Sequence, residues 1–291
     1  MSTRIDSASN PRIAATLKAV EAHEKMLLEG RRMIEEALDA GVSIEEVFVQ
    51  GEEREEEDFL RRVRGAAARV PPEPRVTGVS ARVLRKISDL PSTRGIAALA
   101  VPPHRALASL TPSKKPASSN LTRRSASAAS HGSSADISSS LFLLLDDVQD
   151  PANVGAILRS GEAFGVAAAL LTPGCAWPFS PRALRASAGS AFRLPVAARV
   201  AASEAIAWAR RHGISLAGAA AHGGTAPETL GRVRPLALVI GSEGHGISAA
   251  IAEALDHRVT LPLAGRVDSL NAAVAAGVLL HILTRPPAAA S

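Results

Sequence analysis

Continuous apolar runs followed by segments of helical periodicity dominate the second half of the chain. Residues 141–145 form an unbroken apolar run that ends in two aspartates, which is typical of a strand buried on both faces. Residues 167–171 and 236–240 repeat this pattern, with helix-like segments between them. The alternation predicts an α/β fold with a mostly parallel sheet and helices on both faces. Because ligands bind such sheets at the carboxyl ends of the strands, the residues after each run are candidate site residues.

The first part of the chain alternates between shorter helical and strand-like patterns. Apolar residues spaced three and four apart across residues 26–38 predict an amphipathic helix that ends near Gly41. The remaining patterns predict strands at 47–49, 76–79 and 96–101 and helices at 59–68 and 81–88. Together these elements indicate a small α/β domain.

The composition changes abruptly after residue 102. Twelve serines lie between Ser109 and Ser140, and few apolar residues accompany them, which predicts a flexible linker. Its basic residues outnumber its acids, so a basic arm that touches RNA is the alternative to a solvated tether. We therefore expect a substrate-binding α/β domain at 1–102, a linker at 103–140 and a second α/β domain at 141–291.

Composition narrows the classes of protein that this chain can be. A length of 291 residues with 46% hydrophobic residues allows about two domains with sizeable cores. The single cysteine excludes a disulfide framework, and no uncharged apolar run is long enough to cross a membrane, so we expect a cytoplasmic protein. The net charge of +5 permits a nucleic-acid partner. With only 3% aromatic residues, RNA would be bound through phosphates and shape rather than base stacking.

Three segments that follow apolar runs carry the candidate chemistry. In the first, Pro151 prevents the strand from continuing, and Asn153 is expected to cap a helix that projects Arg159 to a similar side. The second, residues 241–248, is a glycine-rich turn that carries Glu243 and lacks the G-x-G-x-x-G dinucleotide fingerprint. Ordinary capping and an ordinary strand-to-helix turn are the plain alternatives for these two segments.

The third segment, residues 259–271, leads into an apolar helix predicted at 272–283. Asp268 or Ser269 is expected to cap this helix, and Ser269 and Asn271 are polar groups at its start. Plain capping is again the alternative. Across the chain, His222, His245 and His257 lack the spacing of metal ligands, so no metal site is predicted.

Taken together, the three segments resemble the signature motifs of the SpoU (TrmH-like) RNA ribose 2′-O-methyltransferases. The patterns N-x-G-x-x-x-R, I-G-x-E-x-x-G and L-P-x-x-G-x-V-x-S-L-N occur in order and without gaps. Asp268 departs mildly, because many members have glutamate there. The N-terminal residues Asn10-Pro11-Arg12-Ile13 and Leu28-Glu29-Gly30 resemble the ribosomal-protein-like substrate-binding domain that many members carry.

This resemblance implies a deep trefoil knot, a homodimer and S-adenosylmethionine as the cofactor. It implies that Gly241, Leu261 and Leu270 contact the cofactor, and that Arg159 lies in the catalytic centre. Because a neutral guanidine is costly, we favour a role for Arg159 in gripping phosphate and stabilising the forming alkoxide. The other implied active-site residues, which would orient Arg159 and the ribose, are Asn153, Glu243, Ser269 and Asn271.

The implied substrate is structured RNA, and we favour ribosomal RNA over transfer RNA. The alternative is a non-catalytic RNA-binding protein that retains the fold, although such a protein would be free to lose the polar set that is intact here. A nicotinamide-dependent dehydrogenase is disfavoured, because the dinucleotide fingerprint is missing.

Overall fold

A computed structural model describes residues 3–50, 56–67, 73–88, 95–110, 140–231, 233–265 and 267–285. The chain divides into two compact units, and each combines two stretches of sequence. The first unit consists of Met1–Pro103 with Trp177–Arg193, and the second of His104–Ala176 with Leu194–Ser291. Most of the serine-rich segment predicted as a linker, residues 111–139, lies outside the described residues.

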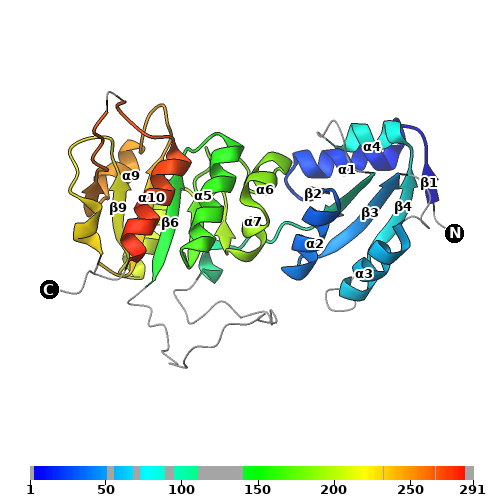
Figure 1. The fold of residues 1–291 in the computed structure, drawn as a ribbon, viewed down its shortest axis with the longest axis horizontal. Helices are drawn as coiled ribbons and strands as arrows, with labels where there is room; N and C mark the ends of the chain where they lie inside the picture. The colour runs from blue at the N-terminus through cyan, green and yellow to red at the C-terminus, as the bar shows by residue number, and fades with distance from the viewer. Residues whose placement is uncertain are drawn as a thin grey trace. The chain divides into compact units, whose positions relative to one another are not determined.

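A five-stranded mixed sheet with helices packed on it forms the first unit (Figure 1). The strand order is β1-β4-β3-β5-β2; β1, β4 and β3 are parallel, and β5 is antiparallel to both β3 and β2. The strands are β1 (Thr3–Ile5), β2 (Met26–Glu29), β3 (Ile44–Gln50), β4 (Arg75–Val79) and β5 (Ile96–Ala100). The helices are α1 (Pro11–Glu21), α2 (Arg31–Asp39), α3 (Glu57–Ala67), α4 (Ala81–Ile87), α6 (Pro181–Ser187) and α7 (Ser190–Arg193).

The helix predicted across residues 26–38 is wrong in its first part. Residues 26–29 form strand β2, which pairs with β5, and helix α2 begins only at Arg31. Gly30 separates the two elements with a φ of 81°, a conformation that other residues rarely adopt. Helical spacing of the apolar residues concealed three consecutive buried side chains, which belong to an edge strand of the sheet. The other strands and helices predicted for this part of the chain are confirmed within one or a few residues.

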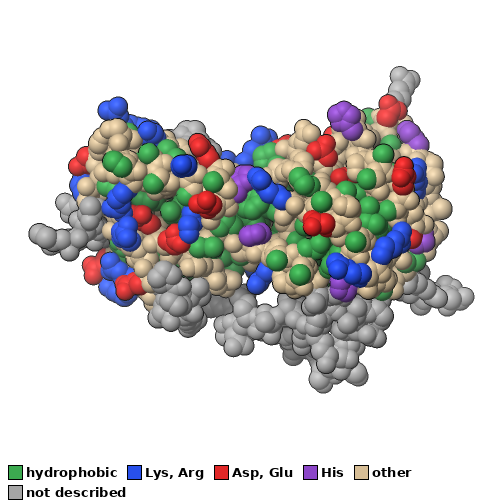
Figure 2. Space-filling view, turned by 180° about the vertical axis from the view of Figure 1, so that it is seen from behind, with side chains coloured by type: hydrophobic (Ala, Val, Ile, Leu, Met, Phe, Trp, Pro, Cys, Tyr) green, Lys and Arg blue, Asp and Glu red, His purple; other side chains and the backbone are tan. Residues whose placement is uncertain are grey.

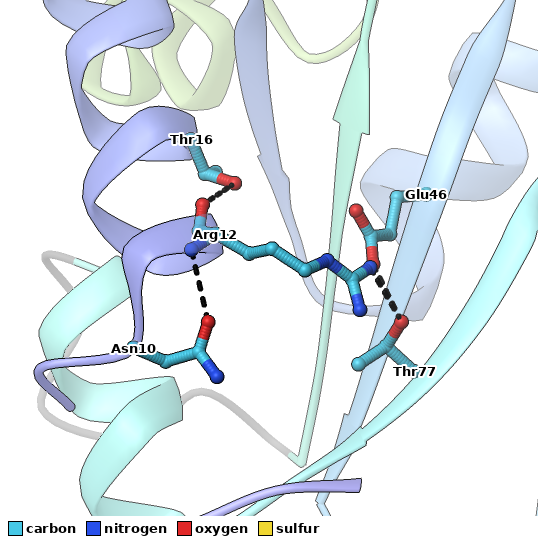
Figure 3. Close-up of polar contacts among 5 residues, drawn as sticks. All are labelled: Asn10, Arg12, Thr16, Glu46 and Thr77. Atoms are coloured by element: carbon cyan, nitrogen blue, oxygen red, sulfur yellow. Dashed lines mark hydrogen bonds and ion pairs between the residues drawn. The ribbon is translucent and has the colours of Figure 1, made fainter. Parts of the chain in front are cut away.

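The Asn10-Pro11-Arg12-Ile13 segment fastens α1 to the sheet (Figure 3). The Asn10 side chain caps α1 by accepting a hydrogen bond from the Arg12 backbone over 2.9 Å. The Arg12 guanidinium reaches β3, where it pairs with Glu46 at 2.5 Å, and Thr77 of β4 donates to the same carboxylate. Since Glu46 is almost buried, Arg12 supplies the charge that makes this burial tolerable.

Residues Trp177–Arg193 are held in the first unit by two ion pairs and a ring stack. Arg185 of α6 pairs with Glu29 at 2.5 Å, and the Glu29 side chain is only 3% exposed. Arg193 of α7 pairs with Glu36 at 2.8 Å. The indole of Trp177 stacks on the imidazole of His23 with ring centroids 4.5 Å apart. This segment follows the first predicted motif in the sequence, but it packs with the N-terminal region in the first unit.

Six parallel strands form the sheet of the second unit, in the order β11-β9-β10-β6-β7-β8. The strands are β6 (Leu141–Asp146), β7 (Ala168–Leu171), β8 (Val196–Ala197), β9 (Ser215–Ala219), β10 (Leu236–Gly241) and β11 (His257–Val259). The helices are α5 (Pro151–Ala163), α8 (Ala202–Arg211), α9 (Ala249–Glu253) and α10 (Ala272–Thr284), with short 3-10 turns at η2 (Leu107–Ser109) and η4 (Pro227–Leu230). The predicted parallel α/β sheet is confirmed.

Helices cover both faces of this sheet. On one face, Trp208 of α8 and Ile251 of α9 pack with Phe142 and Leu144 of β6. On the other, α5 and α10 lie side by side (Figure 1), and the α5 backbone at Gly161 comes close to Leu143. None of the helices within the described ranges combines the length and the apolar character that a membrane crossing requires.

The order in which strands are added to the sheet switches sides between β6 and β10. The chain adds β7 and β8 on one side of β6, and then places β10, β9 and β11 on the other side. The last residues of the two central strands, Asp146 and Gly241, are register partners. Such a switch point forms a crevice at the carboxyl ends of parallel strands, and this crevice is where ligands bind in such sheets. The trefoil knot that the sequence resemblance implies stays a prediction.

Candidate active site

Three polar side chains from distant parts of the chain meet at the switch point. The Asn153 amide nitrogen donates a hydrogen bond to the Glu243 carboxylate, and the Asn271 amide nitrogen donates to the Asn153 oxygen over 3.1 Å. Asn153 comes from α5 after β6, Glu243 from the loop after β10, and Asn271 from the start of α10. Three of the five predicted catalytic residues therefore form one continuous hydrogen-bonded chain, which we call the polar triad.

The helix caps differ from those predicted. Asp150, not Asn153, caps α5, because Pro151 takes the first helical position and the Asp150 carboxylate accepts from the Ala152 backbone over 2.9 Å. Asn271, and neither Asp268 nor Ser269, caps α10. Asn271 is thus fixed at both ends, since its oxygen accepts from two backbone N–H groups of α10 while its nitrogen reaches Asn153. The capping bonds therefore fix the orientation of Asn271, and through it that of the triad, relative to the start of α10.

A cavity of about 250 Å³ opens beside the triad. All three residues predicted to contact the cofactor, Gly241, Leu261 and Leu270, line it, and so do Glu243 and Ser269. Its apolar wall comes from Ile240, Val259 and Leu279. Residues 219–221, at the end of β9, also line it and were missed in the sequence, because the short strand 215–219 has small residues and no long apolar run. Main-chain groups beside an apolar wall suit a small ligand with an aromatic base.

Gly241 is required by the way in which the loop after β10 closes on itself. Ser242 and Gly246 exchange two backbone hydrogen bonds of 3.0 and 2.9 Å, which folds the loop back over Gly241. A Cβ atom at residue 241 would lie 2.3 to 2.5 Å from backbone atoms of Gly246 and Ile247. The loop therefore keeps its shape, and its backbone groups stay at the cavity, only with glycine at this position.

The buried carboxylate of Asp146 anchors this loop to the end of β6. Asp146, 3% exposed at the end of β6, accepts from the Ser248 backbone over 2.7 Å and from the Thr172 hydroxyl over 3.3 Å. Thr172 in turn accepts from the Asp147 backbone over 3.0 Å. The ends of β6 and β7 and the loop after β10 are thus tied to one side chain, because an unsatisfied buried carboxylate would be costly.

Replacement of Asp146 by alanine is expected to lower the free energy of unfolding by about 1 to 3 kcal/mol, since the Ser248 N–H and the Thr172 hydroxyl lose their acceptor. Thermal denaturation measures this loss. Glu253→Gln, at an exposed carboxylate on α9, is the matched control and should melt like the wild type. Equal melting temperatures for Asp146→Ala and the control would contradict the role given to Asp146.

The remaining two predicted catalytic residues lie outside the triad. Arg159 is exposed on α5 and has no hydrogen bond or ion pair to any residue in the described ranges. Six residues along an α-helix leave its side chain roughly 120° from that of Asn153, so the expectation that both project to similar sides is wrong. Ser269 lines the cavity. Because Arg159 is exposed and makes no hydrogen bond or ion pair within the described ranges, its guanidinium is available to an external anion.

Cys175 is a packed thiol rather than a reactive one. Burial raises its pKa, although hydrogen bonds with the backbone of Val148 and with Thr172 act in the opposite direction. Its sulfur donates to the Leu145 carbonyl over 3.2 Å. No group of three or more His, Cys, Asp or Glu side chains arranged to hold a metal ion occurs among the described residues.

Comparison with known proteins matches both parts of the chain. A sequence model of the SpoU rRNA methylase family matches residues 140–281, and one of an MRM3-like substrate binding domain matches residues 16–98. A solved RNA 2′-O ribose methyltransferase is 30% identical, covers 97% of this chain and 98% of its own, and has a TM-score of 0.67. This chain belongs to the SpoU methylase family. The family resemblance seen in the sequence is confirmed.

Two further proteins extend this comparison. The SpoU methyltransferase AviRb from Streptomyces viridochromogenes, solved in complex with AdoMet, is 25% identical, with a TM-score of 0.72 over 94% of this chain and 97% of its own. A tRNA/rRNA methyltransferase of Mycobacterium ulcerans (strain Agy99), described as uncharacterized, is 40% identical over 151 residues, which make up 52% of this chain. The matched region spans about half the length of the curated relatives.

Proposed function

We propose that this SpoU family member transfers a methyl group from S-adenosylmethionine to a ribose 2′-hydroxyl in structured RNA, with ribosomal RNA favoured over transfer RNA. The observation that carries the proposal is the union of the polar triad with a cavity lined by Gly241, Leu261 and Leu270. Similarity along almost the whole chain to a solved RNA 2′-O ribose methyltransferase supports the same reaction.

The residues of the cavity fit this cofactor. The loop after β10 folds so closely over Gly241 that no Cβ fits there. Because residue 241 has no side chain, main-chain groups can face a ligand at this position. Ile240, Val259 and Leu279 supply an apolar wall for an adenine ring. When bound there, S-adenosylmethionine supplies an electrophilic methyl group. The chain itself must then position the ribose and deal with the proton of its hydroxyl.

The polar triad and Arg159 divide this work. Asn271 and Asn153 hold the Glu243 carboxylate in one orientation, and Glu243 keeps an oxygen that accepts no hydrogen bond from the described residues. This oxygen is suited to accept a hydrogen bond from a ribose hydroxyl. Arg159, exposed and permanently charged, binds a substrate phosphate and stabilises negative charge that develops on the ribose oxygen.

A second copy of this chain is part of the proposal. Val274 and Val278 lie one turn apart on α10 and are 53% and 39% exposed, and Val267 just before the helix is 61% exposed. Exposed valines on one helix face favour burial against another protein surface. We propose that this face of α10 contributes to a homodimer.

Calorimetry and methyl-incorporation assays test the proposed function together. The full-length protein is expected to release heat with S-adenosylmethionine, and to transfer labelled methyl groups to ribosomal RNA more readily than to transfer RNA. Ribose-methylation mapping then identifies the nucleotide. Absence of heat from folded protein contradicts the proposal, whereas heat without transfer to either RNA favours a non-catalytic RNA-binding protein that retains the fold.

A further inference from the structure

Every exposed residue of the short helix α4 is a cation. Arg82, Arg85 and Lys86 are exposed, whereas Val83 and Leu84 are completely buried. The remaining members of the helix are the half-buried Ala81 and the buried Ile87, so α4 carries no acid. The helix thus presents one apolar face to the core of the first unit and one wholly basic face to solvent.

Hydroxyl groups adjoin the basic face. Lys86 donates a hydrogen bond to the Ala8 carbonyl over 3.0 Å, which fixes the loop before α1 beside α4. In this loop Ser7 and Ser9 are exposed, and their hydroxyls lie 2.8 Å apart. We call the set Arg82, Arg85, Lys86, Ser7 and Ser9 the α4 face. It combines three positive charges with two hydrogen-bonding groups of the kind that bind phosphate oxygens.

Most other cations of the first unit are paired with acids. Arg62 of α3 pairs with Glu35 at 2.9 Å, and Arg61 lies 3.3 Å from Asp58. Similar pairs involve Arg4, Arg12, Lys25, Arg31 and Arg64. In Figure 2, blue and red side chains are accordingly interspersed over the visible face. Arg82 and Arg85 have no ion pair with any residue that the structure describes, so the α4 face keeps its positive potential.

Helix stability does not account for this arrangement. Arg85 and Lys86 lie in the last turn of α4, where positive charge is favourable to the helix dipole. Arg82, however, is the second residue of the helix after the Ser80 cap, where positive charge is unfavourable. Arg82 opposes the helix dipole and pairs with no acid among the described residues, so its charge is available to an external anion.

We propose that the α4 face binds the phosphate backbone of the RNA substrate, an inference that rests on the proposed function. Arg82 and Arg85 are three residues apart, which places their Cβ atoms about 5 to 6 Å from each other on one side of the helix. Each planar guanidinium can form paired hydrogen bonds with a phosphate. The α4 face therefore holds RNA without reading its sequence, while the cavity of the second unit binds the cofactor.

The salt dependence of RNA binding tests this inference. The full-length protein and the variant Arg82→Gln/Arg85→Gln are titrated with an RNA hairpin between about 50 and 200 mM salt. Loss of two phosphate contacts is expected to reduce the slope of log K against log salt by about 1.4 to 1.8. Arg82→Lys/Arg85→Lys, which keeps both charges, should retain most of the slope.

The matched control is Arg61→Gln/Arg62→Gln, which removes two exposed arginines that are already paired with acids. Its slope should equal that of the wild type. An unchanged slope in Arg82→Gln/Arg85→Gln, or an equal change in the control, overturns the inference. Heat of S-adenosylmethionine binding, measured on the same variants, should be unchanged; its absence even in the wild type would contradict the proposed function and not the α4 face.

Discussion

Replacing Arg159 by alanine is expected to lower methyl transfer by about 10²- to 10³-fold, the typical cost of removing one group that stabilises a developing negative charge. Arg159 is exposed on α5, carries no partner among the described residues, and belongs to the same helix as Asn153 of the polar triad. Because it does not line the cavity, S-adenosylmethionine should bind to the variant as tightly as to the wild type. Methyl incorporation and calorimetric titration, run on one preparation, separate the two effects.

Two further variants sharpen this experiment. Arg159→Lys keeps the charge but loses the planar fork, and should recover only part of the activity. Arg211→Ala removes an exposed arginine at the end of α8, on the opposite face of the sheet, and should leave transfer unchanged. Wild-type turnover in Arg159→Ala would refute the role given to this residue.

Replacing Gly241 by alanine is expected to abolish measurable binding of S-adenosylmethionine. The new Cβ would lie 2.3 Å from the Gly246 carbonyl carbon, and since the obstruction is backbone, the whole loop that carries Glu243 must move. The loop lines the cavity, so its displacement removes contacts to the cofactor and also disturbs the triad. Calorimetry with S-adenosylmethionine measures the loss.

Gly244→Ala is the natural control, because it lies in the same loop and a Cβ there meets nothing within 4 Å. This variant should have the cofactor affinity and the melting temperature of the wild type. If Gly241→Ala bound as tightly as Gly244→Ala, the cavity would not be the cofactor site.

The sequence was most informative where a local pattern decides the structure. The apolar runs at 141–145 and 236–240 predicted the two central strands, since short unbroken runs of this kind are typical of strands buried on both faces. The three motifs predicted Asn153, Glu243 and Asn271, which the fold brings into hydrogen-bonding distance. They could do so because each follows a strand end or precedes a helix, and parallel strands end at the same edge.

Features that depend on distant partners could not be predicted. The identity of a helix cap depends on where the helix begins: Pro151 takes the first position of α5, so Asp150 caps the helix and Asn153 reaches Glu243 instead. The buried role of Asp146 depends on Ser248, a hundred and two residues further along the chain. Residues 26–29 satisfy helical spacing, and only pairing with β5 makes them a strand.

The grouping of Trp177–Arg193 with the N-terminal region bears on how such chains can be recombined. The stretch matched by the SpoU model contains Arg185, Arg193 and Trp177, whose partners Glu29, Glu36 and His23 lie in the N-terminal region. A C-terminal half borrowed from a relative would bring its own version of this stretch and replace the two arginines that pair with Glu29 and Glu36. We therefore expect a chimera of two relatives to fold best when the N-terminal region and residues 177–193 come from the same parent.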